Sequence, residues 1–156
     1  MDEHNWTDAL TVEITAAQLP FVADYQPVAL TILAKAYLRP RRDEWEPLAF
    51  RDEGARTVGV VALVYSEDVC RIRHFAIDVH RQRRGFGGAA MAALIEHVKA
   101  TRPSCRSMVV SFHPDNEPAR RLYTGVGFVV TGVQQNGEPV CSFALRDVLD
   151  PGFWPR

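Results

Sequence analysis

The chain has 156 residues, of which 47% are hydrophobic and 24% charged, and its formal net charge is −1. This balance predicts one soluble globular domain and excludes a polycationic nucleic-acid binder, and no apolar run of about 18 residues predicts a membrane helix. The three cysteines lie far apart, at Cys70, Cys105 and Cys141, which excludes a metal motif or disulfide framework and predicts a reducing, cytoplasmic location.

The first third of the chain predicts one strand and one helix. Residues 1–9 are polar and acidic, so we expect a loose lead-in and no signal peptide. Apolar and polar residues alternate over 10–15, a pattern typical of a strand. A helical spacing of apolar residues over 26–40 is bounded by Pro27 and Pro40 and predicts a helix.

The middle of the chain predicts three strands followed by a helix. Residues 44–68 read as two strands around a turn at 52–55, and residues 68–79 as a third strand. A helix is expected from Gly85 to about Ala100. Its buried stripe should consist of Ala90, Met91, Leu94 and Val98.

The last third predicts a strand, a helix and a hairpin. Residues 107–113 are typical of a buried strand, and a helix follows, capped by Asn116 and ended by Gly127. Two strands are expected over 128–145, around the turn Gln135–Glu138. The predicted fold class is therefore α/β, one domain at 10–146, with a C-terminal tail at 147–156 whose aromatic residues we expect to pack.

The segment 81–88 is the first candidate for a binding site. It places three Arg, one Gln and three Gly directly between a strand and a helix. The free N–H groups of a helix start favour an anion, and Arg83 and Arg84 add positive charge. No Lys follows the glycines and Ala90 stands where a third spaced Gly would be, so neither a Walker loop nor a dinucleotide fingerprint is present. A solvated basic turn is the alternative.

Two segments together resemble the GCN5-related N-acetyltransferase (GNAT) superfamily. The first is the pattern Q-x-x-G-x-G behind a strand, and the second is an Asn, Ala, Leu-Tyr, Gly-Phe series about thirty residues later. The matching residues are Gln82, Gly85 and Gly87, then Asn116, Ala119, Leu122, Tyr123, Gly127 and Phe128. The resemblance implies a GNAT fold: a mixed, mostly antiparallel sheet of about six to seven strands, flanked by helices and splayed at the acetyl-CoA site.

The resemblance also implies acetyl-CoA as co-substrate, without a metal. The glycine loop would bind the pyrophosphate, and the strand before it would pair with the pantetheine arm, with an inner contact at Ile77 and an outer one at Val79. The implied cofactor-binding residues are Ile77, Asp78, Val79, Gln82, Arg83, Arg84, Gly85, Phe86, Gly87, Gly88, Ala89, Asn116 and Tyr123.

By the same resemblance Tyr123 is the general acid that protonates the leaving thiolate. A phenol is protonated at neutral pH and can donate as charge develops on sulfur. The alternative is a core tyrosine, because Tyr123 lies on the apolar stripe of its helix. Asn116 can serve as helix cap, as site residue, or as both.

The general base stays open. Some family members carry a Glu or His on the strand before the glycine loop, but here that register gives Arg71 and Arg73, which accept no proton. Strict alternation places His74 on the opposite face, with Ile72 and Ala76. Water, His113, Asp24 and Glu46 remain alternatives.

The acceptor is expected to be a small-molecule amine. Segment lengths look most similar to bacterial diamine and polyamine acetyltransferases, and this resemblance implies a small di- or polyamine as the acceptor. If Arg71, Arg73 and residues 39–42 face the acceptor, an amine bearing a carboxylate fits better, although 39–42 is also typical of a solvated loop. A non-catalytic, regulatory module that binds CoA is the alternative of another class, and a homodimer is one possible assembly; no nucleic acid or membrane partner is expected.

Overall fold

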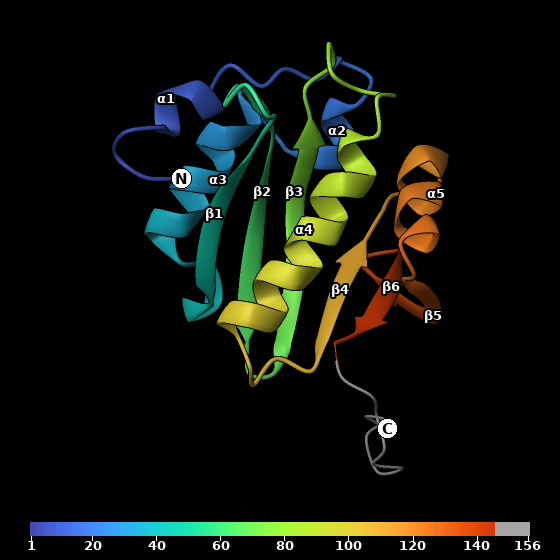
Figure 1. Ribbon diagram of the computed structural model, residues 1–156. Coiled ribbons are helices and arrows are strands. Elements are labelled where there is room, and N and C mark those ends of the chain that lie inside the picture. The colour runs from blue at the N-terminus through green and yellow to red at the C-terminus, as the bar shows by residue number, and fades with distance from the viewer. Residues whose placement is uncertain (146–156) are drawn as a thin grey trace.

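The computed structural model describes residues 1–145, and the predicted tail lies outside the described residues (Figure 1). The domain opens with three helices and a short 3-10 turn, and the strands follow. In chain order the elements are α1 (Trp6–Ala9), α2 (Leu19–Val22), α3 (Val28–Leu38), the 3-10 turn Pro40–Arg42, β1 (Glu44–Arg51), β2 (Thr57–Ser66), β3 (Val69–Ile77), α4 (Phe86–Thr101), β4 (Ser107–Ser111), α5 (Glu117–Gly125), β5 (Val129–Gln135) and β6 (Glu138–Ala144).

The N-terminal segment differs from the sequence prediction in two ways. The expected loose lead-in contains α1 and buries Ala9, and the expected strand at 10–15 is irregular backbone. Val12 and Ile14 are nevertheless buried. The alternation of apolar residues therefore reflects burial against the domain and not pairing in the sheet. The backbone of Glu13 forms hydrogen bonds with the residues that follow β3, and the segment does not form a strand of its own.

The six strands form one sheet in the order β1-β2-β3-β4-β6-β5. Every neighbouring pair is antiparallel except β3 and β4, which are parallel. This parallel pairing runs only from Val69 opposite Ser107 to Arg71 opposite Val109. Beyond Arg71 the two strands are no longer paired and a gap opens between them. This confirms the expected mixed sheet and its splay.

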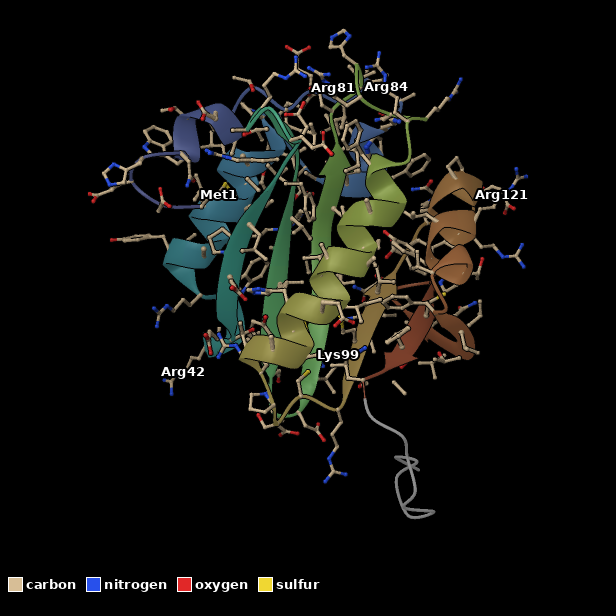
Figure 2. All side chains as sticks on the ribbon, in the orientation of Figure 1. Met1, Arg42, Arg81, Arg84, Lys99 and Arg121 are labelled. Carbon is tan, nitrogen blue, oxygen red and sulfur yellow. The ribbon has the colours of Figure 1, made fainter. Side chains whose placement is uncertain are left out.

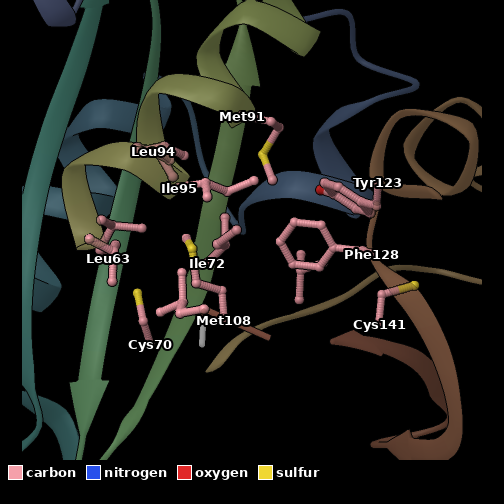
Figure 3. Packing of buried hydrophobic residues seen from close by; sticks show 14 of the residues in the cluster. Leu63, Cys70, Ile72, Met91, Leu94, Ile95, Met108, Tyr123, Phe128 and Cys141 are labelled. Atoms are coloured by element: carbon pink, nitrogen blue, oxygen red, sulfur yellow. The ribbon is translucent and has the colours of Figure 1, made fainter. Parts of the chain in front are cut away.

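Helices cover both faces of the sheet. The amphipathic helix α4 lies across one face (Figure 1), where Met91, Leu94 and Val98 are buried against the strands as their spacing predicts. Figure 3 shows this cluster continuing from Leu63 and Ile72 to Tyr123 and Phe128. A second cluster lies on the other face, where α3 and the N-terminal segment cover β2 with Val28, Ala29 and Ile32.

The helix α5 begins and ends where the sequence predicts. The side chain of Asn116 accepts a hydrogen bond from the Ala119 N–H at 3.2 Å, and Pro118 lies in the first turn. Gly127 follows the helix with φ of +100°, a conformation that favours glycine. These signals set the two ends of the helix. Between them, Tyr123 is the buried residue of α5.

A β-bulge interrupts the regular alternation of β3. The partner of Ala76 on β2 is Val60, but the partner of Arg73 is Ala62, so β3 carries an extra residue between these pairs. His74 has φ of +54° within this bulge. The prediction that His74 shares one face of β3 with both Ile72 and Ala76 is wrong for Ile72. Ile72 packs in the cluster under α4, whereas Ala76 packs in the cluster under α3.

Candidate active site

A cavity of about 580 Å³ lies at the gap between β3 and β4. Its walls come from β3, β4, α5, the glycine loop and the N-terminal segment that carries α2. Of the sequence-predicted residues it collects Ile77, Gln82, Arg83, Gly87, Asn116 and Tyr123. Segments that are far apart in the chain thus meet at one hollow, as the two motifs together predicted.

The glycine loop forms the start of α4. Gly85 precedes the helix with φ of +84°, and Arg83 also has positive φ, at +60°. The Ala89 N–H donates to the Gly85 carbonyl, so the N–H groups of residues 86–88 precede the first intrahelical bond. No atom lies within 4 Å of a Cβ built on Gly88. Open space above free N–H groups suits an anionic oxygen.

Arginines surround this helix start. Figure 2 shows Arg81 and Arg84 beside the N-terminal end of α4, with Lys99 at its opposite end. Arg83 and Arg84 are exposed, while Phe86 and Gly87 are half-buried and Ala89 is exposed. The charge and the free N–H groups therefore occupy the same end of the helix, which is the arrangement that the loop sequence predicted.

Gln82 holds the glycine loop in place through side-chain hydrogen bonds. Its side-chain nitrogen donates to the Ile77 carbonyl at 2.8 Å, and its amide exchanges hydrogen bonds with the amide of Gln18 at 3.0 and 3.3 Å. The glutamine of the motif thus holds the end of β3 and the loop in one geometry. Gln18 was not among the sequence-predicted residues, since it lies 64 residues away from its partner.

Asp78 and Val79 are engaged by the protein itself. The Asp78 carboxylate is buried and accepts from the Glu13 N–H at 3.0 Å and the His80 N–H at 2.9 Å. The Val79 N–H donates to the Glu13 carbonyl at 2.8 Å. Both residues therefore fasten the N-terminal segment to the end of β3, and their direct contact with a cofactor stays a prediction.

The Ile77 N–H is oriented toward the gap. The Asp78 N–H donates to the Val58 carbonyl at 2.9 Å on the β2 side. Successive residues of a strand direct their N–H groups to opposite sides, so that of Ile77 points away from β2 and toward β4. A free N–H at this position can stabilise negative charge on a carbonyl oxygen, as an oxyanion donor does.

Tyr123 belongs both to the core and to the cavity. It is 6% exposed and its ring packs between those of Phe112 and Phe128, with centroids 6.1 and 6.2 Å apart. Figure 3 shows Tyr123 beside Phe128. Its hydroxyl makes no hydrogen bond within residues 1–145, and burial raises the pKa of Tyr123. The two readings of the sequence are compatible, since a buried phenol that lines the cavity remains a protonated donor.

The arginines of β3 divide between two environments. Arg73 lines the cavity and its Nη2 donates to the Gln135 Oε1 at 3.4 Å, whereas Arg71 lies outside it. Burial, followed by the charge of Arg71, lowers the pKa of Arg73. No carboxylate in the described part of the chain forms an ion pair with Arg73. Residues 39–42 are exposed, as the solvated-loop reading predicted.

His74 lines the cavity with both ring nitrogens engaged. Its Nδ1 lies 2.7 Å from the Val22 carbonyl and its Nε2 lies 3.0 Å from the Lys35 Nζ. Since a carbonyl only accepts and an ammonium only donates, Nδ1 carries the proton and Nε2 accepts. Burial lowers the pKa of His74, which favours this neutral form.

The other candidates for the base differ in position. Glu46 accepts from the Tyr65 hydroxyl at 2.6 Å and pairs with the His97 Nε2 at 2.9 Å, on the face of the sheet that α4 covers. His113 contacts the Phe21 ring, and the exposed Asp24 lines the cavity. Sequence reasoning missed Glu138, which also lines the cavity. It had been assigned only to the hairpin turn.

The family model described as the acetyltransferase (GNAT) family matches residues 13–128. The chain belongs to the GNAT acetyltransferase family. The matched range runs from the N-terminal segment, which fastens to β3, through the glycine loop to the end of α5. The comparison with curated protein sequences gave no match.

Solved structures share the fold of this acetyltransferase at low identity. Spermidine N-acetyltransferase from Vibrio cholerae, in complex with CoA and spermine, aligns with a TM-score of 0.69 and 12% identity over 93% of this chain and 92% of its own. Ribosomal-protein-S18-alanine N-acetyltransferase from Escherichia coli gives 0.65 and 14% over 93% and 90%. IAA acetyltransferase from Bacillus cereus gives 0.52 and 17% over 60% and 73%.

The protein is thus an acetyl-CoA-dependent transferase, and the arrangement of its cavity suits that chemistry. Free N–H groups at the start of α4 and the arginines beside them would hold the pyrophosphate, and the Ile77 N–H points toward the gap between β3 and β4. Within residues 1–145 no group of three His, Cys, Asp or Glu side chains could hold a metal ion. No helix in that range is long and apolar enough to cross a bilayer.

Proposed function

We propose that the acetyltransferase moves the acetyl group of acetyl-CoA directly to the primary amine of a small molecule that bears a carboxylate. The observation that supports this proposal is the guanidinium of Arg73, which lies half-buried at the cavity without an ion-pair partner among the described residues. A desolvated guanidinium is costly unless an anion accompanies it, and its fork of donors suits a carboxylate.

Lys35 adds a second cation to the lining of the cavity. Its Nζ is 3.0 Å from His74, and its carboxylate neighbour Asp24 is 3.9 Å away and largely exposed. The positive charges of Lys35 and Arg73 would therefore attract the carboxylate of an acceptor. The ammonium group of the same acceptor then requires a separate anionic contact. The cavity lining contains carboxylates that could supply it.

Diamines and polyamines are the second candidate. Asp24, Asp115 and Glu138 line the cavity and could bind ammonium groups. The structural neighbour that acts on spermidine supports this reading only at the level of fold, because its identity is 12%. Two of the three carboxylates, Asp24 and Asp115, lie in exposed residues, where ion pairs contribute little.

A matched set of four-carbon amines tests the choice. We expect 4-aminobutyrate to be acetylated with a higher kcat/KM than butylamine or putrescine, as measured by release of the CoA thiol at fixed ionic strength. L-amino acids and spermidine extend the panel. Arg73→Ala should remove the preference for the carboxylate, and Arg71→Ala is the control outside the cavity. A preference for putrescine or spermidine that survives Arg73→Ala would favour the polyamine reading.

A further inference from the structure

We propose that Glu138, at the start of β6, binds the ammonium of the acceptor and takes its proton. The inference deepens the proposed function and rests on it only in requiring an amine acceptor. It does not depend on the acceptor's carboxylate. Neither motif of the sequence contains Glu138, and its place in the cavity follows from the pairing of distant strands.

The sheet brings Glu138 to the cavity from the far side of the gap. β6 pairs antiparallel with β4, with Val140 opposite Ser111, so the first residue of β6 lies just beyond the end of β4. The Ser111 hydroxyl donates to the Glu138 Oε2 at 2.7 Å, and both residues are half-buried and line the cavity. This bond fixes the carboxylate and engages one of its two oxygens.

Glu138 lines the cavity together with charged and polar groups of three other elements. From α5, Tyr123 lines the cavity, and burial raises its pKa, with smaller contributions from Cys141 and Glu138. From β3, Glu138 partly offsets the effects of burial and of Arg71 on Arg73. From β4, Ser111 holds it by a hydrogen bond. An anion, a phenol donor and a guanidinium thus line one cavity.

The alternatives for the proton acceptor are less suitable. Both nitrogens of His74 are engaged by Val22 and Lys35, and Glu46 lies on the face of the sheet that α4 covers. Asp24 has a side chain that is 76% exposed and lies near Lys35. Glu138 is a half-buried carboxylate that lines the same cavity as Tyr123.

The proposed proton path balances the reaction. Glu138 takes one proton from the ammonium, and the freed lone pair forms the C–N bond to the acetyl carbon while the C–S bond breaks. Tyr123 gives its proton to the leaving thiolate, and the second proton of the nitrogen restores the phenol. The products are the amide, the thiol and one proton, which Glu138 later releases to water.

The test compares Glu138→Gln with Glu96→Gln, an exposed site on α4, using butylamine as the probe because it has no carboxylate. We expect kcat/KM for Glu138→Gln to fall about a hundred-fold or more at pH 7, with CoA affinity by calorimetry unchanged. The kcat/KM of Glu138→Gln should rise about tenfold per pH unit up to the amine pKa near 10.4, because the variant needs the free amine. The kcat/KM of the parent should reach its plateau at a lower pH.

The outcomes separate this inference from the proposed function. Equal kcat/KM and equal pH profiles for the parent and Glu138→Gln would overturn the role of Glu138, whichever amine is preferred. Loss of activity toward butylamine without any carboxylate preference would support Glu138 and overturn the proposed acceptor class. Glu138→Asp retains a carboxylate and should restore the plateau; if it does not, or if Glu138→Gln loses CoA binding equally, the residue has a structural role.

Discussion

The side-chain amides of Gln18 and Gln82 exchange hydrogen bonds in both directions, at 3.0 and 3.3 Å. This pair joins the segment that precedes α2 to the loop that begins α4. Gln82 also donates to the Ile77 carbonyl, so one side chain connects the end of β3, the anion-binding loop and the N-terminal wall of the cavity. The position of the loop therefore depends on a residue of the N-terminal segment.

Replacing Gln82 or Gln18 should show how far CoA binding depends on the hydrogen bonds that hold the loop in place. Gln82→Ala loses the bonds to both Ile77 and Gln18, so we expect lower CoA affinity and a loss of unfolding free energy of about 1–3 kcal/mol. Gln18→Ala keeps the bond from Gln82 to Ile77 and should lose less of both. Calorimetry with CoA and urea denaturation measure the two effects. Equal CoA affinity in all three proteins would contradict the bracing role.

Tyr123→Phe should lower kcat by roughly ten- to ten-thousand-fold, the range of one acid–base group. The hydroxyl has no hydrogen-bond partner in residues 1–145, so CoA affinity and Tm should change little. Phe128→Leu is the matched control, since it perturbs the same aromatic cluster without removing a donor. Equal turnover by Tyr123→Phe and the parent would show that Tyr123 only packs.

Gly88→Leu should abolish CoA binding while leaving the fold intact. The space around Gly88 is open in the protein, so the side chain would fill the position of the bound anion and not displace other residues. Gly87 is a less selective site, because a Cβ there would lie 3.4 Å from Leu122. Gly125→Ala, on α5 with no atom within 4 Å, is the control. Unchanged CoA affinity for Gly88→Leu, measured by calorimetry, would exclude the loop as the pyrophosphate site.

CoA affinity should fall as salt rises, because part of the attraction is between exposed charges. Arg84→Ala should lower the affinity at low salt and make its salt dependence shallower. Lys99→Ala removes the same charge from the opposite end of α4 and should change neither quantity (Figure 2). Titrations at several ionic strengths distinguish the two variants. Identical slopes for Arg84→Ala and the parent would argue against a charge contact at this position.

His74 should make the protein less stable in acid. Burial lowers the folded-state pKa of His74 below its usual 6.5, against the opposing effect of the hydrogen bond to Val22, so the unfolded chain binds the proton more readily. The stabilisation by neutral His74 is present above pH 6.5 and is lost as the pH falls from 6.5 toward the lower folded pKa. Tm should therefore drop more steeply between pH 7.5 and 5.5 in the parent than in His74→Gln. Parallel curves would contradict this.

Local signals in the sequence were sufficient for most of the fold. The cap at Asn116, the glycine at 127 and the apolar stripe of α4 each act within a few residues, and each is confirmed. Alternation over 10–15 misled the prediction because both a strand and a segment packed irregularly on a core bury every second residue. The bulge at His74 had no local signal, since its φ is positive in a residue other than glycine.

The geometry of the glycine loop at the start of α4 was more predictable than the opposite wall of the cavity. Glycines, arginines and a helix start are adjacent in the chain, so their chemistry can be inferred from spacing. Glu138 and Gln18 reach the site only through the order of strands and the path of the N-terminal segment. Their residue types are common at exposed turns, and only the three-dimensional arrangement distinguishes them from such positions.

The short parallel pairing between β3 and β4 also divides the sheet into two halves. Within residues 1–145, the strand pairing between the half formed by β1, β2 and β3 and the half formed by β4, β6 and β5 covers three residue pairs, from Val69–Ser107 to Arg71–Val109. The core beneath α4 spans both halves. A molecule bound along the open side would contact both halves, so amide exchange in β4 should slow when CoA is added, while β2, paired along its length on both sides, should change little.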